Sequence, residues 1–232
     1  MFEEFADSLV AVHALLRELG CAIEYCPPNV ESEQRAMRLG KSLITSNAQI
    51  GANDFLYGRA AWVFLTDAGG DDVACQFLRC EDIGDERLEQ YLARSYSRQY
   101  RADVRCADGL PKLSGTSVYF GELFARPGAM AGPAAFKRIW AMVSHALHHS
   151  HYHWRFDFCY AFVRDRDACR GALTRYGFTS QWISPLLWVE GPSYRSDTEY
   201  LITTSESDFL YNCRNHRKII QATMGQQESS NL

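Results

Sequence analysis

The sequence predicts an α/β domain built around one strand–helix–strand unit. Residues 119–125 are apolar and aromatic, as expected of a buried strand. Gly132 and Pro133 then suit the N-cap and first position of a helix, which an apolar stripe at helical spacing carries to about His149. Residues 155–163 form a second apolar stretch.

A hairpin and two further strands extend this unit to a mixed sheet of six or seven strands. Ala61–Thr66 and Val73–Cys80 flank the turn DAGGDD, whose residues tolerate positive φ. A polar helix is expected over residues 85–99. Strands are expected at Trp182–Val189 and Glu199–Thr204.

The N-terminal segment is expected to be helical and to pack on the core. Its apolar residues alternate spacings of three and four, up to a stop at Gly20: Phe2, Phe5, Leu9, Val12, Leu16 and Leu19. This seam favours packing within the domain, and the alternative is a dimer contact or a lid. A second helix is expected over residues 31–49.

The chain is expected to divide into three parts. Residues 1–55 would be the N-terminal helical segment and residues 56–213 the catalytic domain. Residues 209–211 would extend the last strand, and residues 214–232 would be a polar C-terminal tail.

Composition narrows the class of protein. The chain has 232 residues, a net charge of −4, 47% hydrophobic and 13% aromatic residues, enough for one well-buried core. The acidic balance disfavours a nucleic-acid partner. No apolar run approaches the roughly 18 residues of a membrane span, so no membrane partner is expected. The acidic start is unlike a signal peptide, so a cytoplasmic protein with reduced cysteines is expected.

The strand–turn–helix at residues 119–140 and the strand–helix–GF at residues 155–178 together resemble the core of the GNAT superfamily of N-acetyltransferases. The resemblance covers about residues 60–190. It implies a mixed, mostly antiparallel sheet of six to seven strands, with two splayed central parallel strands and helices on both faces. It also implies an acyl-CoA co-substrate, acetyl-CoA first among them, and transfer of the acyl group to the amine of a small molecule or peptide.

The resemblance also assigns the donor site. The strand edge at Leu123, Phe124 and Ala125 would hold the pantetheine arm. The turn before the helix would hold the pyrophosphate, through Gly128, Ala129, Met130, Ala131, Gly132 and Ala134. Cys169, on the helix after the second strand, is counted with this site. The turn departs from the family's R/Q-x-x-G-x-G/A pattern, because Met130 stands where a basic or amide residue is usual.

Two residues are the candidates for catalysis. Glu122, on the first central strand, is the candidate general base; the alternative is a solvated carboxylate or one paired with an arginine. The family often has a tyrosine that protonates the departing thiolate, but Leu173 stands at that position. Tyr160 is therefore the candidate donor, with Cys169 or water as alternatives.

Other readings of the same fold stay open. The altered turn is similar to that of acyl-carrier-protein-dependent relatives, which would make a carrier protein the partner. A non-catalytic binding module is a third reading, and a homodimer is compatible with the N-terminal seam.

Histidines cluster at the predicted end of the central helix. His145, His148 and His149 have the spacing of metal-binding pairs, with His151 and His153 following. No cysteine or carboxylate lies close in sequence to complete a site. We therefore expect no resident metal, and only adventitious binding of nickel or zinc.

Overall fold

The computed structural model describes residues 2–55, 58–129, 134–169, 171, 173, 176–196 and 198–228. Seven strands form one sheet in the order β1-β2-β3-β5-β6-β9-β7. The pair β5–β6 is parallel and every other neighbouring pair is antiparallel. This is the predicted mixed sheet, with the predicted parallel pair at its centre.

The strands have the following bounds. In the sheet they are β1 (Ala22–Cys26), β2 (Ala60–Thr66), β3 (Asp72–Asp82), β5 (Thr116–Ala125), β6 (Phe158–Val163), β7 (Ser180–Ile183) and β9 (Tyr200–Ser205). Two others, β4 (Asp103–Cys106) and β8 (Leu186–Val189), form a separate two-stranded ladder.

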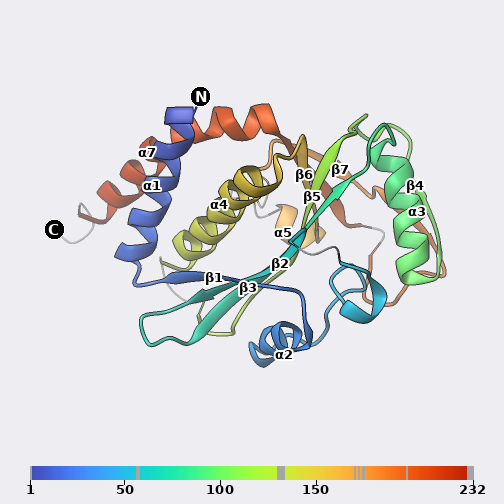
Figure 1. Cartoon of the computed structure of the whole chain (residues 1–232), viewed down its shortest axis with the longest axis horizontal. Coiled ribbons are helices and arrows are strands. Elements are labelled where there is room, and N and C mark those ends of the chain that lie inside the picture. Colours follow the sequence, from blue (N-terminus) through green and yellow to red (C-terminus); the bar gives the residue numbers. More distant parts are fainter. Residues whose placement is uncertain are drawn as a thin grey trace.

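Helices cover both faces of the sheet, as expected (Figure 1). On one face lie α1 (Phe2–Glu18), α4 (Ala134–Trp154) and α7 (Glu206–Glu228), whose apolar residues share one core cluster. On the other face lie α2 (Val30–Arg38), with a short 3₁₀ helix at Ile50–Ala52, and α3 (Leu88–Tyr100). The helix α5 (Asp165–Cys169) follows β6.

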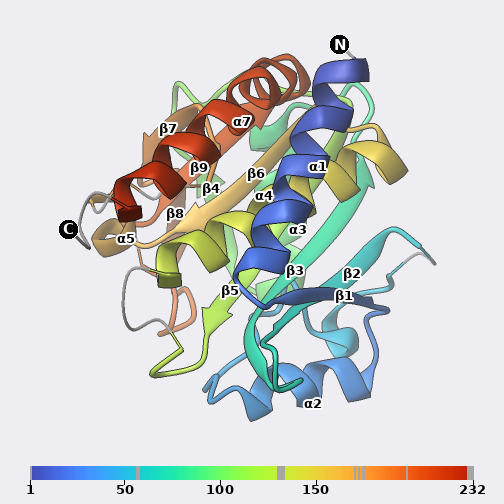
Figure 2. The ribbon, with the colours of Figure 1, turned by 90° about the vertical axis from the view of Figure 1, so that its left-hand side faces the viewer.

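The seam of α1 is buried within the domain, as predicted. Phe5, Val12 and Leu16 are buried, and Leu9 is half-buried. They pack against α4 and α7, which lie beside α1 in Figure 2. Each large apolar side chain so buried stabilises the fold by roughly 1.5–3 kcal/mol. The seam therefore serves this chain's own core, and a homodimer stays a prediction.

Three expected helices and strands of the N-terminal and middle parts differ in extent. The sequence predicts a helix over residues 31–49, but α2 ends at Arg38, because Gly40 takes φ +96° and turns the chain away. The strand expected at Trp182–Val189 is two strands, broken at Ser184, where φ is +48°, and at Pro185. The central helix continues past His149 to Trp154.

The C-terminal part differs most from expectation. Residues 209–211 belong to α7 and do not extend β9. The helix continues to Glu228, through the segment expected to be a polar tail. Phe209 is buried against α1 and α4, and this anchors the first turns of α7. The division of the chain at residues 55 and 213 stays a prediction.

Candidate active site

The two central strands part near the middle of the sheet. Their parallel ladder runs from Ser117↔Phe158 to Phe120↔Ala161 and ends there. Beyond this point β5 continues to Ala125, and its other edge stays paired to β3. Within the described residues, the edge of β5 that faced β6 therefore has no partner strand over its last residues, and its peptide groups could pair with a ligand.

A β-bulge lies where the strands part. From Phe77↔Gly121 to Cys75↔Phe124, β5 advances three residues while β3 advances two. The extra residue is accommodated at Glu122, whose φ is +57°. A left-handed conformation is unfavourable for glutamate and persists only where the surroundings enforce it.

The bulge reverses which side chains face which side of the sheet. Val118 and Phe120 pack in the helix-covered core of α1, α4 and α7. Regular alternation would put residues 122 and 124 there too. Instead Phe124 packs in the core below α2, and Leu123 faces the α4 side.

The carboxylate of Glu122 consequently faces the loop at residues 41–49. Its Oε2 lies 2.9 Å from Lys41 Nζ, and its side chain is 1% exposed. Its Oε1 accepts hydrogen bonds from the backbone N–H of Thr45, at 3.1 Å, and from the Thr45 hydroxyl. Lys41 Nζ also lies 5.5 Å from the centre of the Phe124 ring. Glu122 is thus paired with a lysine, where the sequence suggested a solvated or arginine-paired carboxylate as the alternative to a base.

Gly121 makes the close packing beside the bulge feasible. A Cβ at this position would lie 2.4 Å from the ring of Tyr119. The Tyr119 ring thus lies over the backbone just before Glu122. Burial, and next the charge of Glu122, raise the pKa of the Tyr119 phenol.

The structure describes some of the residues that are expected to bind the acyl-CoA donor. Leu123, Phe124 and Ala125 lie at the end of β5, which stays paired to β3 on one edge and lies beyond the ladder to β6 on the other. Gly128 takes φ +87° in the turn, Ala129 packs on the helix-side core, and Ala134 begins α4. Met130, Ala131 and Gly132 lie outside the described residues. The phosphate turn as a whole therefore stays a prediction.

The two candidate proton donors are in contrasting places. Tyr160 is 1% exposed and lies in the paired part of β6, with its ring 5.4 Å from that of Tyr119. Burial raises the pKa of its phenol well above the usual value, so it stays protonated. Cys169 is an exposed thiol at the end of α5. Leu173 packs against the helix-side core.

A second polar cluster, which the sequence did not reveal, lies on the loop side of the sheet. The Arg195 guanidinium lies 5.2–5.8 Å from the ring centres of four aromatic residues: Tyr96, Tyr100, Phe162 and Trp188. It pairs with Glu199 at 3.3 Å, yet Arg195 Nε has no hydrogen-bond partner within the described chain. Burial raises the pKa of Glu199, and Arg195 partly opposes this. Arg195 lies in the turn after β8, where no motif marks it.

The loop at residues 41–53 joins the two clusters. Thr45 binds Glu122, while two residues further on the Asn47 amide donates to the Tyr96 hydroxyl at 2.7 Å. Arg79 donates to the Asn47 carbonyl and to the Tyr91 hydroxyl. Polar side chains thus line the space between this loop, α3 and the sheet.

Two pockets are lined by residues that the structure describes. One, of about 510 Å³, is lined by residues of α2 and by Ile44, next to Thr45. The other, of about 380 Å³, lies at the far end of α4, between Arg59, His149 and His153. Of these two pockets, the first is lined by Ile44, which belongs to the loop whose Lys41 and Thr45 contact Glu122.

Two histidines of α4, His145 and His149, are half-buried side chains that pack against Tyr25. His145 and His149 lie within the helix, and burial lowers the pKa of each to about 4. They pack against Tyr25, which lies 2.7 Å from His145 Nδ1 and stacks on His149.

All eight cysteines are unpaired thiols, as expected. No helix in the described ranges has both the length and the apolar character needed to cross a membrane.

Comparison with known proteins gives similar structures but no similar sequences. No protein-family model matches the chain, and no curated protein matches it. A spermidine N-acetyltransferase from Vibrio cholerae, determined as a dodecamer, is 12% identical, covers 83% of this chain and 98% of its own, and has a TM-score of 0.47. An acetyltransferase from Streptococcus agalactiae is 12% identical, covers 80% of this chain and 98% of its own, and has a TM-score of 0.46.

The strand pairing of this chain itself decides the fold. Its sheet contains one parallel pair, joined by a helix, and that pair separates beyond Phe120. The pair lies at the centre of an otherwise antiparallel sheet covered on both faces. The chain therefore has the sheet architecture that its resemblance to the GNAT superfamily implies.

Proposed function

We propose that this chain is an N-acyltransferase. It moves an acyl group, in the first place acetyl, from CoA to the amine of a small molecule or peptide. One observation carries the proposal: β5 loses its parallel partner after Phe120 and presents an unpaired edge at Leu123–Ala125. An extended pantetheine arm carries amides that can pair with such an edge as a strand would.

The acceptor approaches from the loop side, where Glu122 points. Lys41 Nζ, 2.9 Å from Glu122 Oε2, occupies the place that a substrate ammonium would take. Exchange of one ammonium for the other keeps the buried carboxylate paired at every stage. Glu122 then accepts the proton that the amine must lose before it attacks the thioester carbonyl.

The proposed site also includes a turn for the pyrophosphate and a proton donor for the departing thiolate. The turn from Gly128 to Ala134 would hold the pyrophosphate at the start of α4, through backbone N–H groups. Tyr160 is protonated, but its enclosed ring would need a relay to reach a departing thiolate. The eight unpaired thiols support a reducing, cytoplasmic setting.

The experiment separates donor binding from proton transfer. Purified protein is incubated with acetyl-CoA and a panel of amines, and acylated product is measured by mass spectrometry. Gly132→Val should raise the donor KM strongly, because a side chain there blocks close approach of the donor. Glu122→Gln should lower kcat and leave the donor KM nearly unchanged. Glu206→Gln, on α7 at the other face, is the control and should match the parent.

A second candidate is a GNAT-fold binding module without catalysis. The observation that favours it is that both oxygens of Glu122 already have partners, Lys41 and Thr45. Thermal shift with acetyl-CoA, a long-chain acyl-CoA and free CoA decides between the readings, since a ligand of the native state raises the melting temperature. A shift without turnover favours the module. No shift with any of the three abandons the CoA proposal, and a carrier-protein donor would be tested next.

A further inference from the structure

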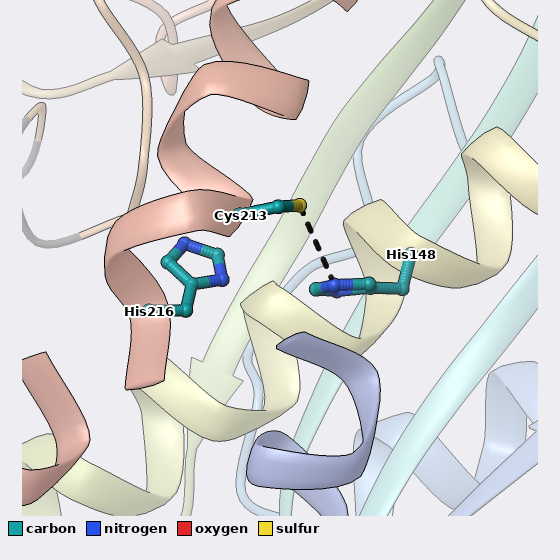
Figure 3. A group of neighbouring side chains, drawn as sticks. All are labelled: His148, Cys213 and His216. Carbon is teal, nitrogen blue, oxygen red and sulfur yellow. Dashed lines mark hydrogen bonds between the residues drawn. The ribbon is translucent and has the colours of Figure 1, made fainter. Parts of the chain in front are cut away.

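A second cluster of chemically active side chains lies on the helix-covered face, away from the gap between β5 and β6. His148 on α4 meets Cys213 and His216 from α7 (Figure 3). One ligand atom from each lies within 4.8 Å of the other two, and all three residues are buried. Cys213 and His216 are three residues apart on a helix, a spacing that turns both side chains to one side.

The distances between these atoms suit a tetrahedral metal. His148 Nε2 lies 3.6 Å from Cys213 Sγ. Zinc bonds of about 2.3 Å to sulfur and about 2.0–2.1 Å to nitrogen, at a tetrahedral angle, would separate the two ligand atoms by about 3.6 Å. The sulfur and this nitrogen therefore need no rearrangement to share one ion.

The orientation of His148 is fixed by a neighbour. Its Nδ1 lies 2.7 Å from the carbonyl oxygen of Ser144, which only accepts hydrogen bonds. The proton therefore sits on Nδ1, and Nε2 carries a lone pair toward Cys213. A backbone carbonyl on the other ring nitrogen is the usual means of orienting a histidine that binds a metal.

A fourth ligand is already in the cluster. Ser8 Oγ, from α1, lies 2.9 Å from His148 Nε2 and 2.8 Å from His216 Nδ1. A tetrahedral zinc would hold oxygen and nitrogen ligands about 3.3 Å apart. Ser8 therefore needs to move outward by only a few tenths of an ångström to bind the ion, or to give way to a water.

We propose that His148, Cys213 and His216, with Ser8 or a water as fourth ligand, form a zinc site that joins α1, α4 and α7. Two imidazoles and one thiolate are ligands that zinc prefers. Binding converts the Cys213 thiol to a thiolate, and its proton leaves to solvent. The ion adds one positive charge net of the thiolate, and it clamps three helices that are distant in sequence.

The competing explanation is a hydrogen-bonded cluster without metal. The Ser8 hydroxyl and the Cys213 thiol can both donate to His148 Nε2, which would satisfy the ring. That explanation predicts no absorption from a metal–thiolate bond, and the zinc site predicts one. The two are therefore distinguishable by spectroscopy as well as by metal content.

The test begins with the full chain, expressed in zinc-supplemented medium and freed of loose metal by gel filtration. Elemental analysis should find roughly one zinc per chain, as a closed site requires. Cys213→Ser and His148→Gln keep hydrogen-bonding groups and should each lose most of the zinc. The matched controls are Cys169→Ser and His153→Gln, an exposed cysteine and an exposed histidine, which should retain it.

Substitution of cobalt(II) for zinc gives a readout in the parent protein alone, which does not depend on how any variant folds. The parent protein should show a sulfur-to-cobalt charge-transfer band in the near ultraviolet, and Cys213→Ser should lack it. Zinc that survives in Cys213→Ser but is lost in His153→Gln would mean an adventitious ion only. A metal-free parent protein, or cobalt without the thiolate band, would overturn the proposal.

Discussion

On the face of the sheet that α2 and the loop at residues 41–49 cover, the buried Glu122 forms an ion pair with the half-buried Lys41. On the face that α1, α4 and α7 cover, His148, Cys213 and His216 are buried without charge. At 1% side-chain exposure, Glu122 is paired with Lys41 and accepts hydrogen bonds from Thr45. Burial lowers the pKa of His148 to about 3 and of His216 to about 4, and raises that of Cys213 to about 11. All three are therefore neutral at ordinary pH.

This difference shows what each cluster can bind. The charged pair is closed: a ligand must replace Lys41 to reach Glu122, which suits an exchange of one amine for another. The neutral cluster has lone pairs and no internal cation, which suits the addition of a metal ion. The Glu122–Lys41 pair therefore favours a substrate amine that binds and leaves, and the His148–Cys213–His216 cluster favours a metal ion that stays bound.

The largest expected effect tests the charged pair. Lys41→Met leaves Glu122 buried without its cation, and we expect a loss of about 3–5 kcal/mol in the free energy of unfolding. Urea denaturation measures it. The control is Arg94→Met, which breaks the exposed Arg94–Glu86 pair and should cost less than about 1 kcal/mol. The double variant Lys41→Met/Glu122→Gln should recover most of the loss. Equal losses for Lys41→Met and Arg94→Met would mean that burial of Glu122 has no energetic consequence.

The central part of the fold follows from sequence because its signals are local. The strand–helix–strand unit and the hairpin carry their apolar periodicity and turn residues within short windows. By contrast, β1 and β4 are short, and few of their side chains are buried, so their patterns are weak. The glycine at residue 40, which ends α2 early, lies in a segment whose composition still favours a helix.

The two clusters show why the sequence identifies one residue of each site but not the residues that contact it. Glu122 was identified, but its partner Thr45 is 77 residues away, in a segment expected to be helical. His148 was also singled out, but Cys213 is 65 residues away, at the last position of the expected catalytic domain, just before the expected tail. The bulge that aims Glu122 depends on pairing with β3, which no local pattern in β5 encodes.

A pH titration sharpens the contrast, with a smaller expected effect. His145 faces Tyr25 of β1, whose hydroxyl lies 2.7 Å from its Nδ1, and His13 of α1, whose ring centre lies 4.8 Å away. Burial lowers the pKa of His145 from 6.5 to about 4. The folded protein thus binds fewer protons than the unfolded chain between these values. Stability is therefore full above about pH 6.5 and falls as the pH drops toward 4.

His145→Gln removes this contribution. We expect the stability difference between pH 6.5 and pH 5 to shrink by about 1–2 kcal/mol, measured by urea denaturation at both values. The exposed His153, changed to glutamine, is the control and should leave the difference nearly as it was. An unchanged pH difference in His145→Gln would show that the fold does not lower the pKa of this ring.

The smallest expected effect tests the neutral cluster in the absence of metal. Ser8→Ala removes the hydroxyl that lies between His148 Nε2 and His216 Nδ1. In chelator-treated protein we expect a loss of about 1–2 kcal/mol in the free energy of unfolding, the cost of buried neutral groups without a partner. The exposed Ser42, changed to alanine, should have almost no effect. The loss stays below that of Lys41→Met because Cys213 still lies 3.6 Å from His148 Nε2 and no charge is stranded. A loss as large as that of Lys41→Met would mean that the helix-side cluster carries charge, and the contrast between the two faces would fail.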